Sequence, residues 1–383
     1  MLRTLGLRVV AVISCFAGAA IGVAEPLQMQ VDGPRFVGAV GCKSSSCHGG
    51  AGEKRSQYLT WLEKDFHTRA YAILTTARSE RIASAAGISA ATKDHGCTSC
   101  HMPLQKVQQV RLTKTADPHE GVSCENCHGA AEPWLRGHTR KDWTYGTRVG
   151  AGMRDLKNFY VRANTCVACH ENIDAKLLAA GHPELIFELD GQSVAQPKHW
   201  HDPPESGARA WLVGQAVALR ELSWRLTLTG PSDARAVAQW QGLAWLLAEA
   251  TAADGTLTRI GRPGDESDDA AFRRTQQQAD ELARQAAQRS LGRQFARGLL
   301  RQLASLDGTF AAANESPREI AFSRAQRLIL ALERLSLAAL DQQAGSSVAP
   351  EFVALRDELQ MPTDFDPARF GQQLERYRLT LSP

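Results

Sequence analysis

Cysteine and histidine are absent from this 383-residue chain beyond His201. The sequence also has no basic block and no basic stripe interleaved with aromatic residues, and its 44 Lys and Arg residues nearly balance 41 Asp and Glu residues. These absences exclude the charge pattern of a nucleic-acid-binding protein. The apolar run from Val9 to Val23 is shorter than the ~20 residues that a membrane-spanning helix needs. We therefore expect no stable membrane span, and we look for the chemistry in the first half of the chain.

Eight of the nine cysteines lie in four short motifs that end in Cys-His. Three have the form C-x-x-C-H, and the motif Cys42–His48 has four residues between its cysteines. In C-x-x-C-H the two thiols form thioethers with haem and the histidine is the proximal iron ligand. Residues i, i+3 and i+4 share one face of a helical turn, where a porphyrin edge and its iron need them. The predicted covalent haem residues are Cys42, Cys47, Cys97, Cys100, Cys124, Cys127, Cys166 and Cys169, and the predicted proximal ligands are His48, His101, His128 and His170. The pattern predicts four covalently attached haem c groups.

Other uses of paired cysteines fit this pattern less well. A zinc ribbon needs four ligands and has no use for a histidine after every second cysteine. A thioredoxin-like pair would occur once, beside a βαβ pattern, and none is visible. In the wide motif, residues i, i+5 and i+6 do not share a helical face, so two residues must loop out. Its alternative is an ordinary Cys42–Cys47 disulfide.

The N-terminus has the features of a secretory signal. Arg3 and Arg8 precede the apolar run, and Ala24 ends a stretch of small residues. Removal of residues 1–24 would take Cys15 away and leave eight cysteines, two for each haem. An uncleaved anchor or a lipidated Cys15 are the alternatives. The sequence predicts a periplasmic protein, which agrees with thioether attachment outside the cytoplasm.

The two halves of the mature chain differ in composition. We expect a tetrahaem cytochrome c domain over residues 25–205 and a helical C-terminal domain over residues 206–383. The predicted fold is mainly α: a multihaem module with little regular secondary structure, followed by an all-α helical bundle. Apolar residues at helical spacing indicate the bundle. The clearest stripes are Leu212/Leu219/Leu222/Leu226, Val237/Trp240/Ala244/Leu247, Leu291/Phe295/Leu299/Leu303 and Ala325/Leu328/Leu332/Leu335, with helix starts at Ser316-Pro317 and Asp366-Pro367.

Seven further histidines are available as distal iron ligands, and at least three of them must do something else. The candidates are His67, which follows a probable helix, His138, His182 beside a proline, and His119. The other three histidines and Met153 are weaker candidates. His95 lies very close to its own motif, and His199 and His201 alternate about Trp200, so only one of these two can face a given iron. His119 could also donate to a propionate or relay protons.

Over roughly residues 37–175 the chain resembles the tetrahaem cytochrome c-554 family. The matching elements are the order of the four sites, the segment Trp61…His67-Thr68-Arg69-Ala70, and Gly121-Val122-Ser123-Cys124-Glu125-Asn126-Cys127-His128-Gly129 followed by His138. The resemblance implies closely stacked haem pairs and periplasmic electron transfer. It also implies that His138 is the distal ligand of the first haem, that His67 ligates a later haem, and that the second haem can be five-coordinate.

The chain departs from this family in its wide first motif, in the segment Gly181 to Trp200, and in the whole helical half. Residue-level reasoning alone therefore selects His182 as the last distal ligand and leaves His95 or His119 to close the second site. The main hypothesis is a carrier of single electrons between redox partner proteins. The alternatives are a reductase or oxidase of a small nitrogen or sulfur compound at one five-coordinate haem, and a sensor whose helical half reports ligand binding there.

Overall fold

The computed structural model describes residues 33–381 except 172, 204–205, 253, 265–266, 312–316 and 341–349. The predicted signal segment with Cys15, and the predicted helix start at Ser316, lie outside the described residues. Residues 34–383 form one compact unit by their internal contacts. The mainly α prediction is confirmed, because no β-sheet occurs in the described part of the chain and the only extended pairing found there is a bridge between Phe36 and Leu112.

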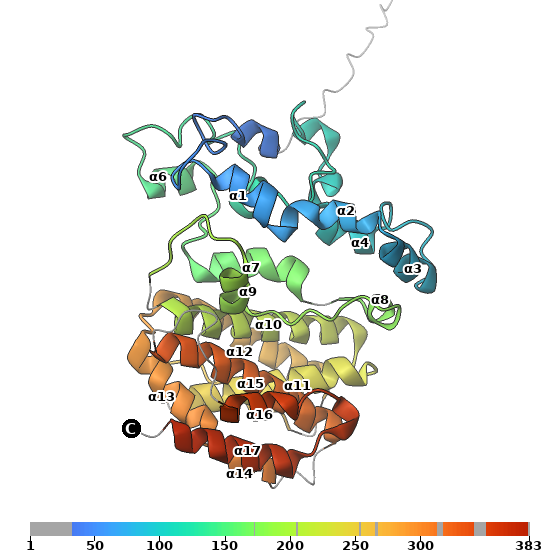
Figure 1. Cartoon of the computed structure of the whole chain (residues 1–383), viewed down its shortest axis with the longest axis vertical. Coiled ribbons are helices and arrows are strands. Elements are labelled where there is room, and N and C mark those ends of the chain that lie inside the picture. The colour runs from blue at the N-terminus through green and yellow to red at the C-terminus, as the bar shows by residue number, and fades with distance from the viewer. Residues whose placement is uncertain are drawn as a thin grey trace, which may run out of the picture. The chain divides into compact units, whose positions relative to one another are not determined.

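Short helices and 3-10 turns build the first half (Figure 1). Their bounds are η1 Ala39–Cys42, α1 Gln57–Lys64, η2 Phe66–Arg69, α2 Ala70–Leu74, α3 Ala77–Ala85, α4 His95–His101, η3 Pro103–Lys106, η4 Gln109–Arg111, α5 Cys124–His128, α6 Tyr145–Gly150, α7 Phe159–His170, α8 Ala175–Ala179 and α9 Leu189–Ala195. Before α7, the buried apolar residues form only small clusters, such as Leu74 with Met102 and Val37 with Trp134. Such small clusters are expected where a bulky cofactor supplies much of the apolar core.

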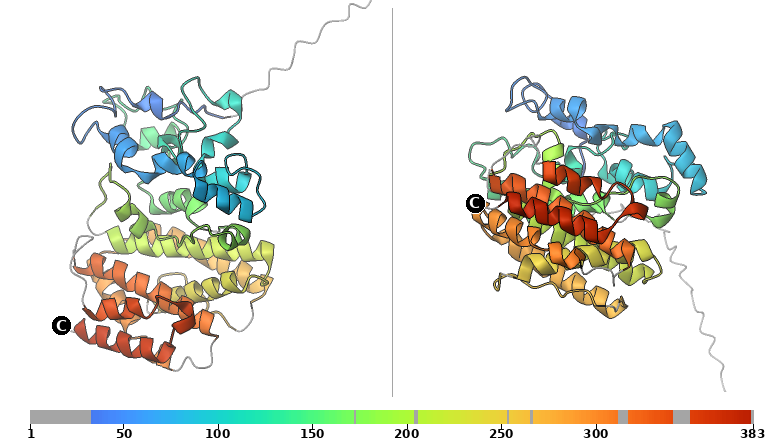
Figure 2. Two further views of the ribbon diagram at one scale, coloured as in Figure 1. Left: turned by 45° about the vertical axis from the view of Figure 1, so that its right-hand side comes forward. Right: turned by 60° about the horizontal axis from the view of Figure 1, so that its bottom comes forward.

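Long helices build the second half, and they lie side by side in Figures 1 and 2. Their bounds are α10 Gly207–Thr229, α11 Ala234–Ala252, α12 Asp269–Gln288, α13 Arg293–Ala304, α14 Asp307–Ala311, α15 Arg318–Leu340, α16 Pro350–Asp357, η7 Pro362–Asp364 and α17 Pro367–Thr380. The four predicted stripes fall on α10, α11, α13 and α15 and are largely buried in one core, with Leu291 just before α13. Asp366 caps α17 by accepting from the backbone N–H of Ala368 at 2.9 Å.

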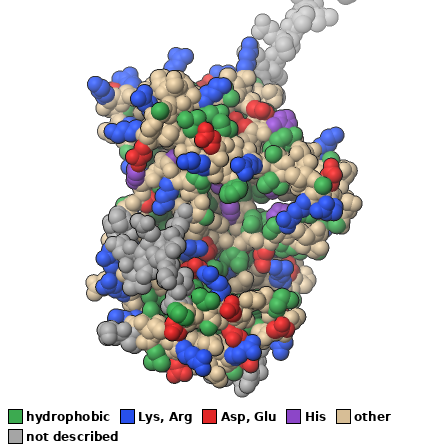
Figure 3. All heavy atoms as spheres, viewed as in Figure 1, with side chains coloured by type: hydrophobic (Ala, Val, Ile, Leu, Met, Phe, Trp, Pro, Cys, Tyr) green, Lys and Arg blue, Asp and Glu red, His purple; other side chains and the backbone are tan. Residues whose placement is uncertain are grey.

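Helix α7 joins the two halves, because it carries the fourth motif and packs on α10 and α12. Its residues Phe159 and Val167 belong to the bundle core. The Arg220 guanidinium of α10 donates to Asp280 Oδ1 of α12 at 2.9 Å and to Asn164 Oδ1 of α7 at 2.5 Å. This network fixes the helix that ends at His170 against the bundle. On the face shown in Figure 3, the visible histidines lie over the first half of the chain.

Candidate haem sites

The wide first motif forms a tight turn. Cys42 ends η1, the Cys47 N–H donates to the Ser44 carbonyl at 2.8 Å, and the His48 N–H donates back to the Cys42 carbonyl at 3.3 Å. The extra residues therefore loop out, and the turn still brings Cys42 and His48 together. Gly49 is required here, because a Cβ at this position would lie 1.8 Å from the Lys43 carbonyl oxygen.

Each regular motif lies on a helix whose start is capped. Asp94 accepts from the backbone N–H of Gly96 at 2.8 Å at the start of α4. Ser123 and Asn126 form a capping box at the start of α5, and Asn158 caps α7. Helical geometry therefore places both cysteines and the histidine of each motif on one face.

Every predicted proximal histidine faces a second histidine from elsewhere in the chain. The four pairs and their ring-centroid separations are His48 with His138 (6.1 Å), His101 with His182 (6.5 Å), His128 with His199 (6.4 Å) and His170 with His67 (6.0 Å). Metal–imidazole bonds of about 2.0 Å, with about 1.15 Å from each nitrogen to its ring centre, place two axial imidazole centroids about 6.3 Å apart. All four separations therefore match the spacing of two imidazoles on one iron.

Neighbouring groups hold Nδ1 of six of these eight imidazoles. The contacts from Nδ1 are His48 to Gln57 Oε1 (3.0 Å), His67 to Asp65 Oδ1 (2.9 Å), His101 to the Ala70 carbonyl (2.9 Å), His138 to the Leu135 carbonyl (2.6 Å), His170 to the Gln192 carboxamide (3.3 Å) and His182 to the Pro183 carbonyl (2.8 Å). The five contacts to oxygen make Nδ1 a donor, orient the ring and leave Nε2 for a metal. At His170 the contacting atom is the amide nitrogen of Gln192, and this contact fixes the position of the ring only. Sequence reasoning missed Gln57, Asp65 and Gln192. Asp65 had a signal, because it lies two residues before His67, whereas Gln57 and Gln192 reach their histidines only through the fold.

Burial keeps several of the imidazoles neutral, which is the form that ligates a metal. Burial lowers the pKa of His128 and the pKa of His170 to about 4. It also lowers the pKa of His101 and of His199, and the neighbouring His182 and His48, respectively, act in the same direction. These four imidazoles can therefore ligate iron without first losing a proton near neutral pH.

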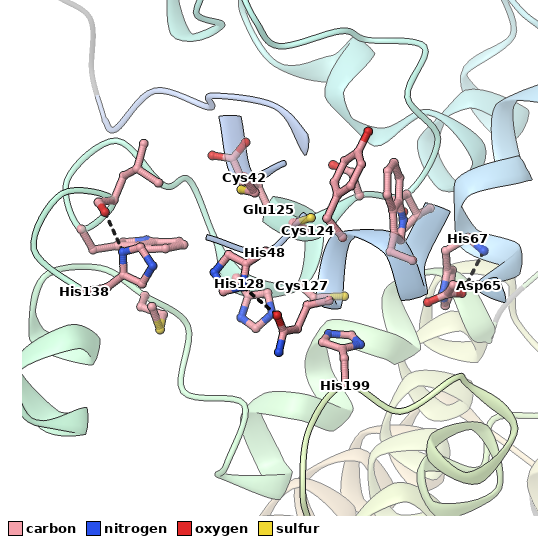
Figure 4. Close-up of a pocket in the computed structure, with 18 of the residues that line it drawn as sticks. Cys42, His48, Asp65, His67, Cys124, Glu125, Cys127, His128, His138 and His199 are labelled. Carbon is pink, nitrogen blue, oxygen red and sulfur yellow. Dashed lines mark hydrogen bonds and ion pairs between the residues drawn. The ribbon is translucent and has the colours of Figure 1, made fainter. Parts of the chain in front are cut away.

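The first and third motifs open into one cavity of about 310 Å³, shown in Figure 4. Its lining includes the pairs His48/His138 and His128/His199, with Cys42, Cys124 and Cys127. This volume lies within the range of cofactor sites, about 300–1,000 Å³. Trp134 Nε1 and Arg148 Nε are also in the lining and buried, and neither has a hydrogen-bond partner among the described residues. Two unpaired donors suit the propionates of a haem, so the residues present fit this cofactor.

Residues 41–129 match the family model for cytochrome c554 and c-prime. This part of the chain belongs to the cytochrome c554 family. The c554 segment contains the first three motifs, while His138, the fourth motif and the helical half lie beyond it. The family implies covalently bound haem c and electron transfer, so the chain is a c-type cytochrome. No significant match to this chain was found among curated proteins or solved structures.

The c554 segment contains His119, which the structure does not bring to a proximal histidine. Its ring contacts Tyr71 at a centroid separation of 4.8 Å, its Nδ1 lies 3.1 Å from Asp117 Oδ1, and 55% of its side chain is exposed. His199 stands opposite His128 instead, and His201, 88% exposed, lies beside Glu53. The loop after α9 brings His199 to the third motif, whereas the His119 side chain faces solvent.

The loop that carries His199 is anchored to α7. Arg162 donates two hydrogen bonds to the Asp202 carboxylate, at 2.9 and 2.8 Å, and the Trp200 indole N–H donates a third at 2.8 Å. Burial raises the pKa of Asp202, but these donors outweigh it and hold that pKa below its ordinary value of 3.8. The ion pair therefore fixes the path of the chain next to His199.

Thiols of different motifs also come into contact. The Cys42 side chain lies next to that of Cys124, and the Cys100 side chain next to that of Cys169. The first motif therefore adjoins the third, and the second adjoins the fourth. Cys42 and Cys47 are not joined by a disulfide in this structure. Among the residues that the structure describes, no three His, Cys, Asp or Glu side chains gather as a metal site.

Proposed function

We propose that this chain is a periplasmic tetrahaem cytochrome that carries single electrons between redox partner proteins. The observation that carries the proposal is that a second imidazole stands opposite each of the four predicted proximal histidines. We assign His138, His182, His199 and His67 as the distal ligands that face His48, His101, His128 and His170.

Bound haem c supplies one-electron chemistry between ferric and ferrous iron. The protein's part is to hold the ligand pairs with little movement between the two redox states. The Asp65 carboxylate accepts from both the backbone N–H and the ring Nδ1 of His67, which fixes that imidazole in position and tautomer. The carbonyl groups of Ala70 and Leu135 accept from the ring Nδ1 of His101 and of His138, respectively, and orient those imidazoles.

Contacts between the motifs support a linear order of the four sites. The first and third motifs are joined by the Cys42–Cys124 contact, and the fourth and second by the Cys169–Cys100 contact. Cys127 and Cys166 interact electrostatically and connect the third motif with the fourth. We infer that electrons pass along the sequence first, third, fourth, second site, in either direction.

The reductase or oxidase alternative requires an iron with an open coordination position. His182 stands opposite His101 at the second site, which the family resemblance leaves five-coordinate. His119 would have served proton delivery there, but it lies on the surface against Tyr71. These positions favour the carrier over both the enzyme and the sensor.

The periplasmic assignment rests on the sequence of residues 1–24 and on thioether chemistry. No helix in the described ranges is long and apolar enough to cross a membrane. The donor and acceptor are proposed to be redox proteins.

A reductive titration of the purified holoprotein under carbon monoxide tests the proposal. A carrier with four bis-histidine sites takes up four electrons per chain, and its reduced spectrum is unchanged by carbon monoxide. Formation of a carbon monoxide adduct at one haem would establish an open iron and favour the enzyme. An uptake of three electrons would show that the wide motif holds no haem.

A further inference from the structure

Helix α9 brings two buried carboxylates beneath the fourth motif. Its residue Gln192 lies 3.3 Å from His170 Nδ1 through the side-chain amide. One turn earlier, Glu188 at the N-cap and Asp190 in the first turn are only 7% and 8% exposed. These acidic groups lie outside the matched c554 segment, and the proposed ligand sets do not use them.

Arginines of α15 face this pair from the bundle. Arg334 Nε lies 3.6 Å from Glu188 Oε2, and Arg327 is 3% exposed and interacts electrostatically with Glu188. Arg334 also lies close to α9, since a Cβ at Gly191 would lie 2.9 Å from its Nη2. Two carboxylates and two guanidiniums are therefore enclosed where the cytochrome module meets the bundle.

The hydrogen bonds of this cluster are incomplete. Glu188 Oε1 and Asp190 Oδ1 are buried and lack partners among the described residues, and the neighbouring charges are of both signs, with Glu333 beside the arginines. A buried carboxylate oxygen that accepts no hydrogen bond is poorly stabilised as an anion. Binding a proton removes the negative charge and converts the oxygen into an O–H group. The geometry is therefore that of a proton-binding site.

We propose that Glu188 and Asp190 share a proton whose binding is coupled to reduction of the iron held by His170. The proposal rests on the proposed function, because it needs a haem at the fourth motif. One electron from the redox partner reduces ferric iron to ferrous iron, and one proton from water binds a carboxylate oxygen, forming an O–H bond. Oxidation reverses both transfers, so charge is balanced in each direction.

The physical cause is electrostatic. Ferric iron has one more positive charge than ferrous iron, and it favours the ionised pair through a low-dielectric region. Reduction removes that charge, so proton affinity rises, and by linkage protonation raises the reduction potential. Helix α9 connects the carboxylates with the iron ligand. Gln192, which contacts His170, lies only two residues after Asp190.

The surroundings of Asp190 place its titration near neutral pH. Burial and the neighbouring Glu188 together raise the pKa of Asp190 to about 7, against the opposing effects of Arg334 and of backbone hydrogen bonds. Burial also raises the pKa of Glu188, against the effects of Arg334 and Arg327. Glu333 on α15 also acts on Glu188 and raises its pKa. Glu171 after α7 and the uncharged Gln215 of α10 bind the backbone of Phe187, the residue before Glu188.

Spectroelectrochemistry of the holoprotein between pH 5.5 and 8.5 tests the coupling. The reduction potential of one of the four haems should fall as pH rises, by up to about 59 mV per pH unit. This slope corresponds to a tenfold change in the equilibrium constant of a one-electron step. Asp190→Asn should flatten this slope. Asp269→Asn, at a 60%-exposed carboxylate on α12, is the matched control and should keep it. A slope that persists in Asp190→Asn, or its absence from the wild type, overturns the proposal.

Redox-difference infrared spectroscopy on the wild type needs no variant to fold. Reduction should produce the C=O band of a protonated carboxylic acid, and Glu188→Gln should change it. No such band would contradict the proposal. If four bis-histidine haems are present and none of their potentials depends on pH, this inference fails and the proposed function stands. If fewer than four are present, the proposed function itself fails.

Discussion

Replacing His199 with alanine is the sharpest test of the ligand assignment. His199 faces His128 at a centroid separation of 6.4 Å, and the other three pairs use different residues. The variant should therefore convert one iron in four from low-spin to high-spin and leave three unchanged. Electron paramagnetic resonance of the ferric protein should show a high-spin signal equal to about one quarter of the iron. The reduced variant should bind one carbon monoxide per chain.

His119→Ala is the matched control, because His119 is half exposed and contacts Tyr71 rather than a proximal histidine. It should leave all four irons low-spin and insensitive to carbon monoxide. The reasoning is refuted if His199→Ala remains entirely low-spin at full haem content. It is also refuted if His119→Ala produces the high-spin iron, since the ligand would then be the histidine suggested by the sequence.

Three further predictions concern the wide motif, the helix network and the loop ion pair. Changing both Cys42 and Cys47 to serine should lower the holoprotein mass by one haem; an unchanged haem count would show that the wide motif is not an attachment site. Arg220→Ala, which breaks the network joining α7, α10 and α12, should lower the free energy of unfolding in urea by about 3 kcal/mol. Arg273→Ala, which breaks an exposed pair, should change it little, and equal effects would contradict the packing argument. The lowered pKa of Asp202 means that its contribution is present above the ordinary carboxyl pKa and is lost as pH falls below about 4. In Asp202→Asn the free energy of unfolding should therefore decrease less between pH 7 and pH 3 than it does in the wild type. An equal decrease in both proteins would show that this ion pair is not its cause.

Local features of the sites were predictable from the sequence because they depend on spacing within one turn. The three regular motifs lie on helices as expected, and Cys42 and His48 come together by looping out the intervening residues. The long apolar stripes predicted the bundle helices for the same reason, since a period near four residues gives one buried face. Cofactor attachment and the mainly α fold follow from such short patterns.

Distal ligands depend on contacts between distant segments, which spacing does not encode. His199 and His119 both lie in loops, and only the packing of α7 with the Asp202 loop distinguishes them. The buried pair Glu188 and Asp190 was equally invisible, because acidic residues normally indicate an exposed surface. Its burial results from the packing of α9 on α10 and from the arginines of α15, which lie far along the chain.

The central claim is that four irons each lie between two imidazoles. Spin quantitation by electron paramagnetic resonance of the fully oxidised holoprotein, with iron and haem counted per chain, tests it most directly. The account predicts four haems and four low-spin ferric irons per chain, without a high-spin component. A high-spin signal amounting to one iron, or a count of three haems, would contradict it.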